Sequence, residues 1–230
     1  MLVLVQARSS SERLPGKVLR SMAGRPMLSW LLESLGQCKR VTDVVLATSD
    51  LASDDRIADF AETFGVSCFR GSLTDVAGRL ASAAISRHAD SFVRISGDSP
   101  LMDFRIVDQM IDLYTAGKPD LATNVQLRTF PKGFSVEAVC LSALERARSM
   151  MEPGDEEHVT PVFYRRPDCF RIVGLTSGMN LGGIQMSVDT VEDFDLTERI
   201  MGHMTRSHWS YDMQELVKIW MSCGQGAEPC

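Results

Sequence analysis

Short apolar runs rich in β-branched residues alternate along the chain with longer segments of helical period. The runs that we expect to form strands are residues 2–5, 44–47, 92–95, 121–124, 136–139, 170–175 and 185–188. The expected helices lie near residues 27–38, 54–64, 75–88, 104–116, 142–151, 156–165, 191–205 and 212–221. Strands that alternate with helices form largely parallel sheets whose two faces are covered. The pattern therefore predicts an α/β fold with a mostly parallel sheet and helices on both faces.

The length and composition fit one hydrophobic core. With 230 residues and 44% apolar content, we expect residues 1–221 to form a single domain. The regular alternation lapses over residues 123–139, where Thr129-Phe130-Pro131-Lys132-Gly133 predicts a turn that leads into another strand. We interpret this stretch as an excursion from the main sheet, and residues 222–230 as a disordered tail.

The charges are unevenly distributed along the chain. The formal net charge of -6 argues against general nucleic-acid binding, which depends on accumulated Lys and Arg. Residues 1–32 nevertheless carry five cations and one acid. A cationic opening on an acidic protein favours a small anionic ligand over a long polyanion.

Cysteine usage and hydropathy bear on the compartment. The six cysteines include no C-x-x-C pair, which predicts free thiols in a reducing cytoplasm. No secretory pattern opens the sequence, and no apolar run approaches the roughly 18 residues of a membrane span. We therefore expect a cytoplasmic protein without membrane association.

The loop that follows the first strand carries candidate ligand-binding chemistry. Ligands of open α/β sheets bind beyond the carboxyl ends of strands, which is where this loop lies. It is not a P-loop, because Ser11 stands at the first glycine position and Val18 follows the lysine, and the dinucleotide fingerprint is also absent. Its amides, hydroxyls and cations suit a polyphosphate, the alternative being a solvated basic turn. The candidate residues are Ala7, Arg8, Ser9, Ser10, Arg13 and Lys17.

Two aspartates are expected at the same edge of the sheet. Asp98 follows the strand at 92–95, and Asp189 precedes a helix whose start is marked by Thr190 and Asp193. Mg²⁺ suits one or two carboxylates together with phosphate oxygens. Asp98 alone could be a turn residue and Asp189 a helix-start carboxylate. Together with a cationic loop, however, they form an arrangement suited to phosphoryl or nucleotidyl transfer.

A further pair of residues could line a substrate pocket. Glu157 and His158 lie in the stretch Glu156-Glu157-His158-Val159-Thr160 at the start of an expected helix. For His158, packing in the structure is the alternative to contact with a ligand.

These residues resemble a known family. The stretch ARSSSERLPGKVL, with GRPML just after it, is similar to the opening signature of the cytidylyltransferases that make CMP-activated sugars, the CMP-sialic acid and CMP-Kdo synthetases. The resemblance continues through residues 69–84, 94–103, 156–172 and 187–196. The segments EHVTP and SVDTVEDF point to the spore-coat polysaccharide branch, the SpsF-like proteins.

The resemblance implies a fold, a reaction and a set of site residues. The fold would be of the nucleotide-diphospho-sugar transferase type, and the reaction would use CTP, a sugar and Mg²⁺. Family members generally form homodimers through an excursion of the sheet. By this resemblance Arg8, Lys17 and Asp98 would be catalytic, and Asp98 and Asp189 would hold the metal. The other implied residues are Arg13, Arg70 and Gly71 for the nucleotide, and Glu137, Glu157 and His158 for the sugar.

One departure from the branch lies beside Glu137. SpsF-like proteins tend to carry P-D-G-x-D-V-E, whereas this chain has Lys132 and Ser135 at the two aspartate positions. We expect this departure to affect which sugar is bound and how active the protein is. Our hypothesis is that the anomeric hydroxyl of a 2-keto acid sugar attacks the α-phosphorus of CTP and displaces pyrophosphate, for surface polysaccharide synthesis. A sugar-nucleotide glycosyltransferase and a non-catalytic nucleotide-binding subunit are the alternatives.

Overall fold

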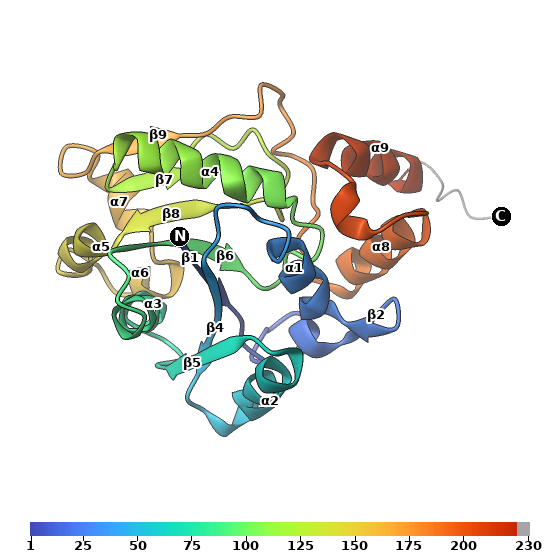
Figure 1. Ribbon diagram of the computed structural model, residues 1–230, viewed down its shortest axis with the longest axis horizontal. Helices are drawn as coiled ribbons and strands as arrows, with labels where there is room; N and C mark the ends of the chain where they lie inside the picture. Colours follow the sequence, from blue (N-terminus) through green and yellow to red (C-terminus); the bar gives the residue numbers. More distant parts are fainter. Residues whose placement is uncertain (225–230) are drawn as a thin grey trace.

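A seven-stranded sheet forms the centre of the molecule, as the computed structural model of residues 1–224 shows (Figure 1). Its strands lie in the order β5-β4-β1-β6-β8-β7-β9. In chain order their bounds are β1 Leu2–Gln6, β4 Asp43–Ser49, β5 Ser67–Gly71, β6 Ser91–Ser96, β7 Leu121–Thr123, β8 Glu137–Cys140 and β9 Ile172–Gly174. A small separate hairpin joins β2 (Ser21–Met22) to β3 (Arg25–Pro26).

The sheet is mostly parallel, which confirms the prediction. Strand β1 pairs in parallel with β4 on one side and with β6 on the other, and β5 and β9 extend this direction at the two edges. Within this sheet β8 runs opposite to its neighbours β6 and β7. The carboxyl ends of β1, β4 and β6 therefore meet at one edge, the place where α/β sheets bind ligands.

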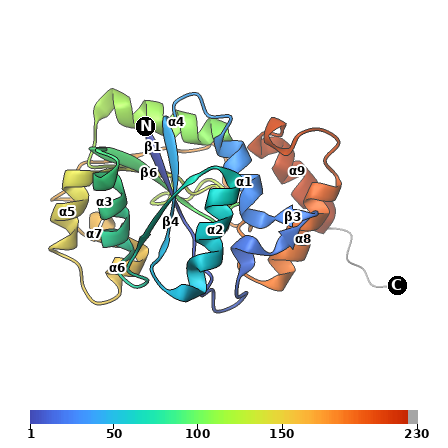
Figure 2. The same ribbon diagram turned by 60° about the horizontal axis from the view of Figure 1, so that its bottom comes forward.

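Helices cover both faces of the sheet (Figure 2). Their bounds are α1 Met27–Leu35, α2 Asp55–Phe64, α3 Val76–Ser86, α4 Phe104–Gly117, α5 Leu141–Arg148, α6 Asp155–His158 and α7 Pro161–Arg165. Val3 and Val5 of β1 belong to the core beneath α1, α2 and α4, whereas Leu2 and Leu4 belong to the core beneath α3, α5 and α7. Alternate residues of one strand thus enter two cores, and this explains its uninterrupted apolar sequence.

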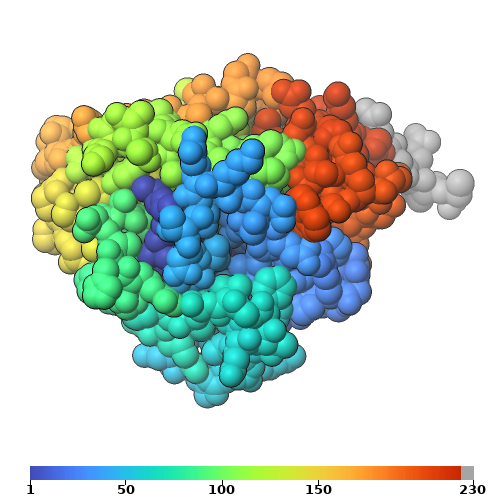
Figure 3. Space-filling view, in the orientation of Figure 1, coloured from blue at the N-terminus to red at the C-terminus, as the bar shows by residue number. Residues whose placement is uncertain are grey.

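Two C-terminal helices, α8 (Val191–Gly202) and α9 (Met213–Gly224), form one flank of the molecule beside the segment that follows β1 (Figure 3). Glu198 accepts a hydrogen bond from the amide of Ala23 at 2.8 Å, and the guanidinium of Arg20 lies over the ring of Phe194. These contacts hold α8 next to the β2–β3 hairpin.

Two expected elements are wrong. Residues 185–188 form no strand, because Gln185 makes only an isolated bridge with Lys132 and the backbone of Val188 is bonded to the site residues described below. The helix expected over residues 156–165 is two short helices, α6 and α7. The break falls at Val159, whose φ is 69°, and Pro161 then begins α7.

The expected excursion is a loop over residues 124–136 between β7 and β8. It bonds to residues 177–186 of the same chain: the amide of Lys132 donates to the carbonyl of Ile184, and the amide of Leu181 donates to the carbonyl of Thr129. Leu127 at its tip is 66% exposed.

The C-terminal segment begins as helix. Helix α9 extends to Gly224, so it enters the segment 222–230 that the sequence assigned to a tail. The remaining residues of that segment lie outside the described part of the chain. No helix within residues 1–224 is both long and apolar enough to cross a membrane.

Candidate active site

A cavity of about 470 Å³ opens at the carboxyl edge of the sheet. It extends from the loop after β1 onto the face of the sheet that α3 and α6 cover. Eight of its lining residues were expected at a site from the sequence: Ala7, Arg8, Arg13, Lys17, Asp98, Glu157, His158 and Asp189.

Asp54 anchors the loop after β1 to the rest of the fold. This fully buried carboxylate accepts hydrogen bonds from the amide of Ser9 at 2.7 Å and from the hydroxyls of Thr48 and Ser49 at the end of β4. Burial raises the pKa of Asp54, but its hydrogen bonds from Ser49 and Ser9 outweigh burial and the pKa lies below its ordinary value. Asp54 therefore remains ionised and fixes the loop to β4.

The loop closes on itself through Gly16. The amide of Gly16 donates to the carbonyl of Ser9 at 2.9 Å, and its φ of 69° is one that glycine adopts without strain. The turn ends at Lys17, the first residue of a short 3₁₀ helix. This turn places the long side chain of Lys17 beneath the loop.

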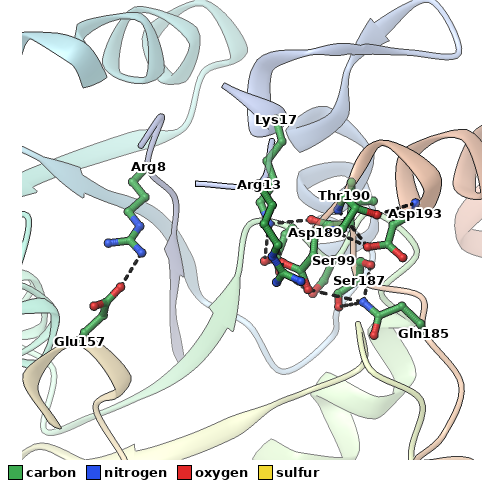
Figure 4. A network of polar contacts seen from close by, with 12 residues as sticks. Arg8, Arg13, Lys17, Ser99, Glu157, Gln185, Ser187, Asp189, Thr190 and Asp193 are labelled. Carbon is green, nitrogen blue, oxygen red and sulfur yellow. Dashed lines mark hydrogen bonds and ion pairs between the residues drawn. The ribbon is translucent and has the colours of Figure 1, made fainter. Parts of the chain in front are cut away.

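The ammonium of Lys17 joins three distant parts of the sequence (Figure 4). It lies 3.0 Å from Asp98 Oδ2, 3.0 Å from Asp189 Oδ1 and 2.6 Å from the carbonyl oxygen of Val188. Only 9% of the lysine side chain is exposed. A buried ammonium that donates three hydrogen bonds, two of them to carboxylates, is fully satisfied. The structure thus brings together the lysine and both aspartates that the sequence placed at one edge.

Asp98 is positioned by a close approach of two strands. The amide of Gly97 donates to the carbonyl of Gln6 at 2.8 Å, and a Cβ at this position would lie 3.0 Å from that oxygen. The carbonyl of Asp98 in turn accepts from the amide of Val188 at 2.9 Å. The glycine lets the end of β6 approach β1, and the carboxylate follows directly.

Asp189 is positioned by the start of α8. Thr190 and Asp193 form a capping box there, as the sequence predicts, and Asp193 also accepts from the amide of Asp189 at 2.9 Å. Burial raises the pKa of Asp189, but the hydrogen bond and charge of Lys17 outweigh it, so the pKa lies below its ordinary value. Arg13, 3.3 Å away, adds to this effect.

The two aspartates fit a Mg²⁺ site that is completed by a ligand. Within residues 1–224, Asp98 Oδ1 accepts only a long hydrogen bond from Ser99 Oγ at 3.5 Å, and Asp189 Oδ2 accepts only one from Gln185 Nε2 at 3.5 Å. Each carboxylate therefore keeps one oxygen available. Within residues 1–224 no cluster of three or more acidic, His or Cys side chains could hold a metal. A donor set of two carboxylates suits Mg²⁺ when phosphate oxygens complete the shell.

The opposite wall of the cavity comes from α3 and α6. Glu157 of α6 forms an ion pair with Arg8, and His158 lies beside it on the same short helix. Both members of the pair are more than a third exposed, so the pair contributes little to stability. It leaves Arg8 free to exchange Glu157 for an anionic ligand.

Five predicted site residues do not line this cavity: Ser9, Ser10, Arg70, Gly71 and Glu137. The amide of Ser9 is engaged by Asp54. Arg70 pairs with Asp55 and donates to the carbonyls of Ser49 and Leu51. Glu137 is 2% exposed and lies behind Arg94. Their roles toward a ligand stay predictions.

Two arginines that line the cavity were not predicted from the sequence. Arg79 of α3 and Arg94 of β6 each interrupt an apolar stretch, at Val76–Ala81 and at Phe92–Ile95 respectively. Charged residues are rarely buried unless they serve a partner. A charge at a core position of an apolar element was therefore the available signal.

This fold and site define a nucleotidyltransferase: an open α/β sheet whose carboxyl edge carries a cationic loop and two aspartates. Comparison with known proteins is consistent with that class. The profile of the cytidylyltransferase family matches residues 2–219. The chain belongs to the cytidylyltransferase family and is a nucleotidyltransferase.

Individual relatives place it further. The spore coat polysaccharide biosynthesis protein SpsF of Bacillus subtilis is 29% identical over 201 residues, which cover 85% of this chain and 83% of that protein. The structure of a cytidylyltransferase from Leptospira borgpetersenii superposes with a TM-score of 0.91 at 30% identity, covering 99% of this chain and 98% of that one. The CMP-sugar synthetases with their SpsF branch are thus the part of the family that this chain fits, as the sequence motifs predict.

A more distant structure shares the fold. That of CMP:2-keto-3-deoxy-manno-octonic acid synthetase complexed with CTP has a TM-score of 0.68 at 18% identity, covering 87% of this chain and 98% of that one. At this identity the likeness shows the fold alone, and it confirms the expected nucleotide-diphospho-sugar transferase type.

Proposed function

We propose that this protein transfers CMP from CTP to the anomeric hydroxyl of an acidic 2-keto sugar and releases pyrophosphate. The observation that carries the proposal is the convergence of Lys17, Asp98 and Asp189 under a cationic loop at the carboxyl edge of the sheet. Membership of the cytidylyltransferase family supports transfer of a cytidylyl group, and the names of SpsF and of the synthetase support a sugar acceptor.

In the proposed reaction the sugar oxygen forms a bond to the α-phosphorus. The bond from that phosphorus to the bridging oxygen breaks, pyrophosphate leaves with the electron pair, and the hydroxyl proton passes to solvent. Arg8, Arg13 and Lys17 offset the negative charge that collects on the phosphates. Because the Lys17 ammonium is held on three sides, it needs little reorganisation during the reaction.

The same proposal includes Mg²⁺, held by Asp98 and Asp189. When bound, the ion would withdraw charge from phosphate oxygens and so favour departure of pyrophosphate. The chain's own contribution is to hold both carboxylates close together, through Lys17 and through the capping box of α8.

We also propose the setting of the enzyme. The product would supply surface polysaccharide synthesis, in line with the name of SpsF, and the reaction would take place in the cytoplasm. A homodimer would form through the loop 124–136, where Leu127 is exposed. Light scattering of the wild type and of Leu127→Asp tests the dimer: a monomeric wild type would contradict it.

A pyrophosphate-release screen tests the reaction. Each of the four nucleoside triphosphates is combined with Mg²⁺ and a panel of acidic, phosphorylated and neutral sugars. We expect release from CTP with an acidic sugar, and a loss of at least about 100-fold in kcat for Asp98→Asn. Asp112→Asn, a surface carboxylate paired with Arg40, is the matched control and should keep wild-type rates. Near-normal turnover by Asp98→Asn would reject the assignment.

A further inference from the structure

The guanidinium of Arg94 is held by protein on one side and free on the other. Its Nε donates to Gln6 Oε1 at 2.8 Å and its Nη1 to Glu137 Oε2 at 2.6 Å. Its Nη2 donates to no acceptor within residues 1–224, although the side chain lines the cavity and is 18% exposed. Arg94 therefore presents a fixed, charged donor to whatever the cavity contains.

The carboxylate behind Arg94 is unusually well fixed. Glu137 is buried and accepts hydrogen bonds from the hydroxyls of Tyr164 at 2.5 Å, Thr160 at 3.3 Å and Thr123 at 3.4 Å, in addition to Arg94. Burial raises the pKa of Tyr164, and the adjacent Glu137 charge raises it further, so the phenol stays protonated and donates. A carboxylate with this many donors cannot turn toward the cavity without losing them. Glu137 thus orients Arg94.

A second arginine, Arg79, adds positive charge to this wall. Arg79 is 3% exposed, its Nη1 donates to the backbone carbonyls of Ser72 and Leu73, and its Nε has no acceptor. Within the described residues no carboxylate lies within 4.0 Å of it. Burial lowers the pKa of Arg79 and the charge of Arg8 lowers it further, which outweighs the opposite effect of Asp54, Asp75 and Asp50. A buried cation without a direct ion pair favours an anionic ligand.

The position of Arg94 separates it from the phosphate end of the cavity. Arg94 lies two residues before the end of β6, which places it roughly 7 Å below the edge at about 3.3 Å per residue. In the proposed function, Lys17, Arg13 and the two aspartates bind the metal and the phosphates at that edge. The anion that meets Arg94 therefore belongs to the other substrate.

We propose that Arg94 binds the carboxylate of an acidic sugar acceptor, with Glu137 and Gln6 as positioning residues. A planar guanidinium is well matched to a carboxylate, and Nη2 supplies a charge-assisted hydrogen bond in a cavity wall where Arg79 adds positive charge. This inference rests on the proposed function, because it names the group of the acceptor that the same cavity recognises.

Steady-state kinetics with matched acceptors test it. Pyrophosphate release is measured at saturating CTP and Mg²⁺ with 3-deoxy-manno-octulosonate and the other 2-keto acid sugars of the panel, each beside its carboxamide. For Arg94→Lys and Arg94→Gln we expect KM for the acid to rise about 10- to 100-fold, the range that loss of one charged hydrogen bond gives. KM for CTP should stay within about threefold of the wild-type value. Because only the acid loses affinity, the ratio of kcat/KM for the acid to that for the amide should fall. Arg40→Lys, on a remote surface pair, is the control.

Two further variants guard against a purely structural effect. Glu137→Gln should raise KM for the acid while leaving KM for CTP unchanged, which a general loss of folding would not do. Gln6→Met removes the acceptor of Arg94 Nε but leaves the buried Glu137 paired, and should raise KM for the acid about 3- to 10-fold. Calorimetric binding of CTP to each variant reports that the fold is intact.

The outcomes separate this inference from the proposed function. If the Arg94 variants and Gln6→Met turn over and keep the wild-type preference for the acid, the role of Arg94 is overturned. Cytidylyl transfer itself would be unaffected by that result. If the wild type turns over neutral sugars only, the role of Arg94 is likewise overturned and cytidylyl transfer is not. Absence of pyrophosphate release from CTP with every acceptor rejects the proposed function, and the inference falls with it.

Discussion

The Lys17→Met variant removes the ammonium on which the site converges. Methionine keeps the length of the side chain and fills the same volume. The variant loses three hydrogen bonds from a charged donor, each of which contributes about 1.5–3 kcal/mol when buried. The carboxylates of Asp98 and Asp189 are 22% and 28% exposed, so water recovers part of this loss. We expect the free energy of unfolding to fall by about 2–4 kcal/mol.

Thermal and urea unfolding measure this effect. For a chain of this length the loss corresponds to a Tm lower by about 4–16 °C. Because the two carboxylates then lack their shared cation, about 10 mM Mg²⁺ should raise the Tm of Lys17→Met more than that of the wild type. Lys39→Met, an exposed lysine, is the matched control and should stay within about 0.5 kcal/mol of wild type. A Lys17→Met variant as stable as this control would refute the reasoning.

Three further predictions concern the same framework. Asp54→Asn should lower the free energy of unfolding by about 1–3 kcal/mol and raise KM for CTP, because the loop loses its anchor at Ser9. Urea unfolding and steady-state kinetics measure the two effects. An unchanged KM would contradict the anchoring role. The pKa values of Asp54 and Asp189 are lowered by folding, so the stability they confer is full above the unfolded carboxyl value of about 3.9 and is lost as the pH falls through the lower folded values. Unfolding followed from pH 6 to pH 2 should therefore show a smaller loss in Asp54→Asn than in wild type, and equal slopes would count against this source. Gly97→Ala should destabilise the fold by about 1–3 kcal/mol and lower kcat, since its Cβ would meet the carbonyl of Gln6. Gly202→Ala, with open space around it, is the control and should do neither. Equal stability of the two variants would contradict the proposed steric clash.

The central strands were predictable because they are buried on both faces. Leu2–Gln6 and Ser91–Ser96 enter cores on either side of the sheet, so their sequences are nearly continuous in apolar residues. Strand β5 was missed because it lies at the sheet edge, where Ser67 and Arg70 need no burial. The segment 185–188 is apolar and extended, but its hydrogen bonds go to Lys17, Asp98 and Lys132 rather than to a strand partner.

The site was predictable only where chain topology fixes position. Lys17 and Asp98 follow parallel neighbouring strands, so their convergence follows from the fold, and Asp189 precedes a helix with a clear capping signal. The orientation of Glu137 was not predictable, because it depends on the hydroxyls of Tyr164 and Thr160, which reach it from a short helix and the turn before it. Sequence spacing carries no information about such contacts between distant elements.

The most direct test of cytidylyl transfer follows the oxygen of the acceptor. A 2-keto acid sugar labelled with ¹⁸O at its anomeric hydroxyl is incubated with the enzyme, CTP and Mg²⁺, and the products are analysed by mass spectrometry and ³¹P NMR. We predict a CMP-sugar that retains the label in the oxygen bonded to phosphorus, formed together with one equivalent of pyrophosphate. A product without the label at phosphorus, or consumption of CTP without pyrophosphate, would contradict it.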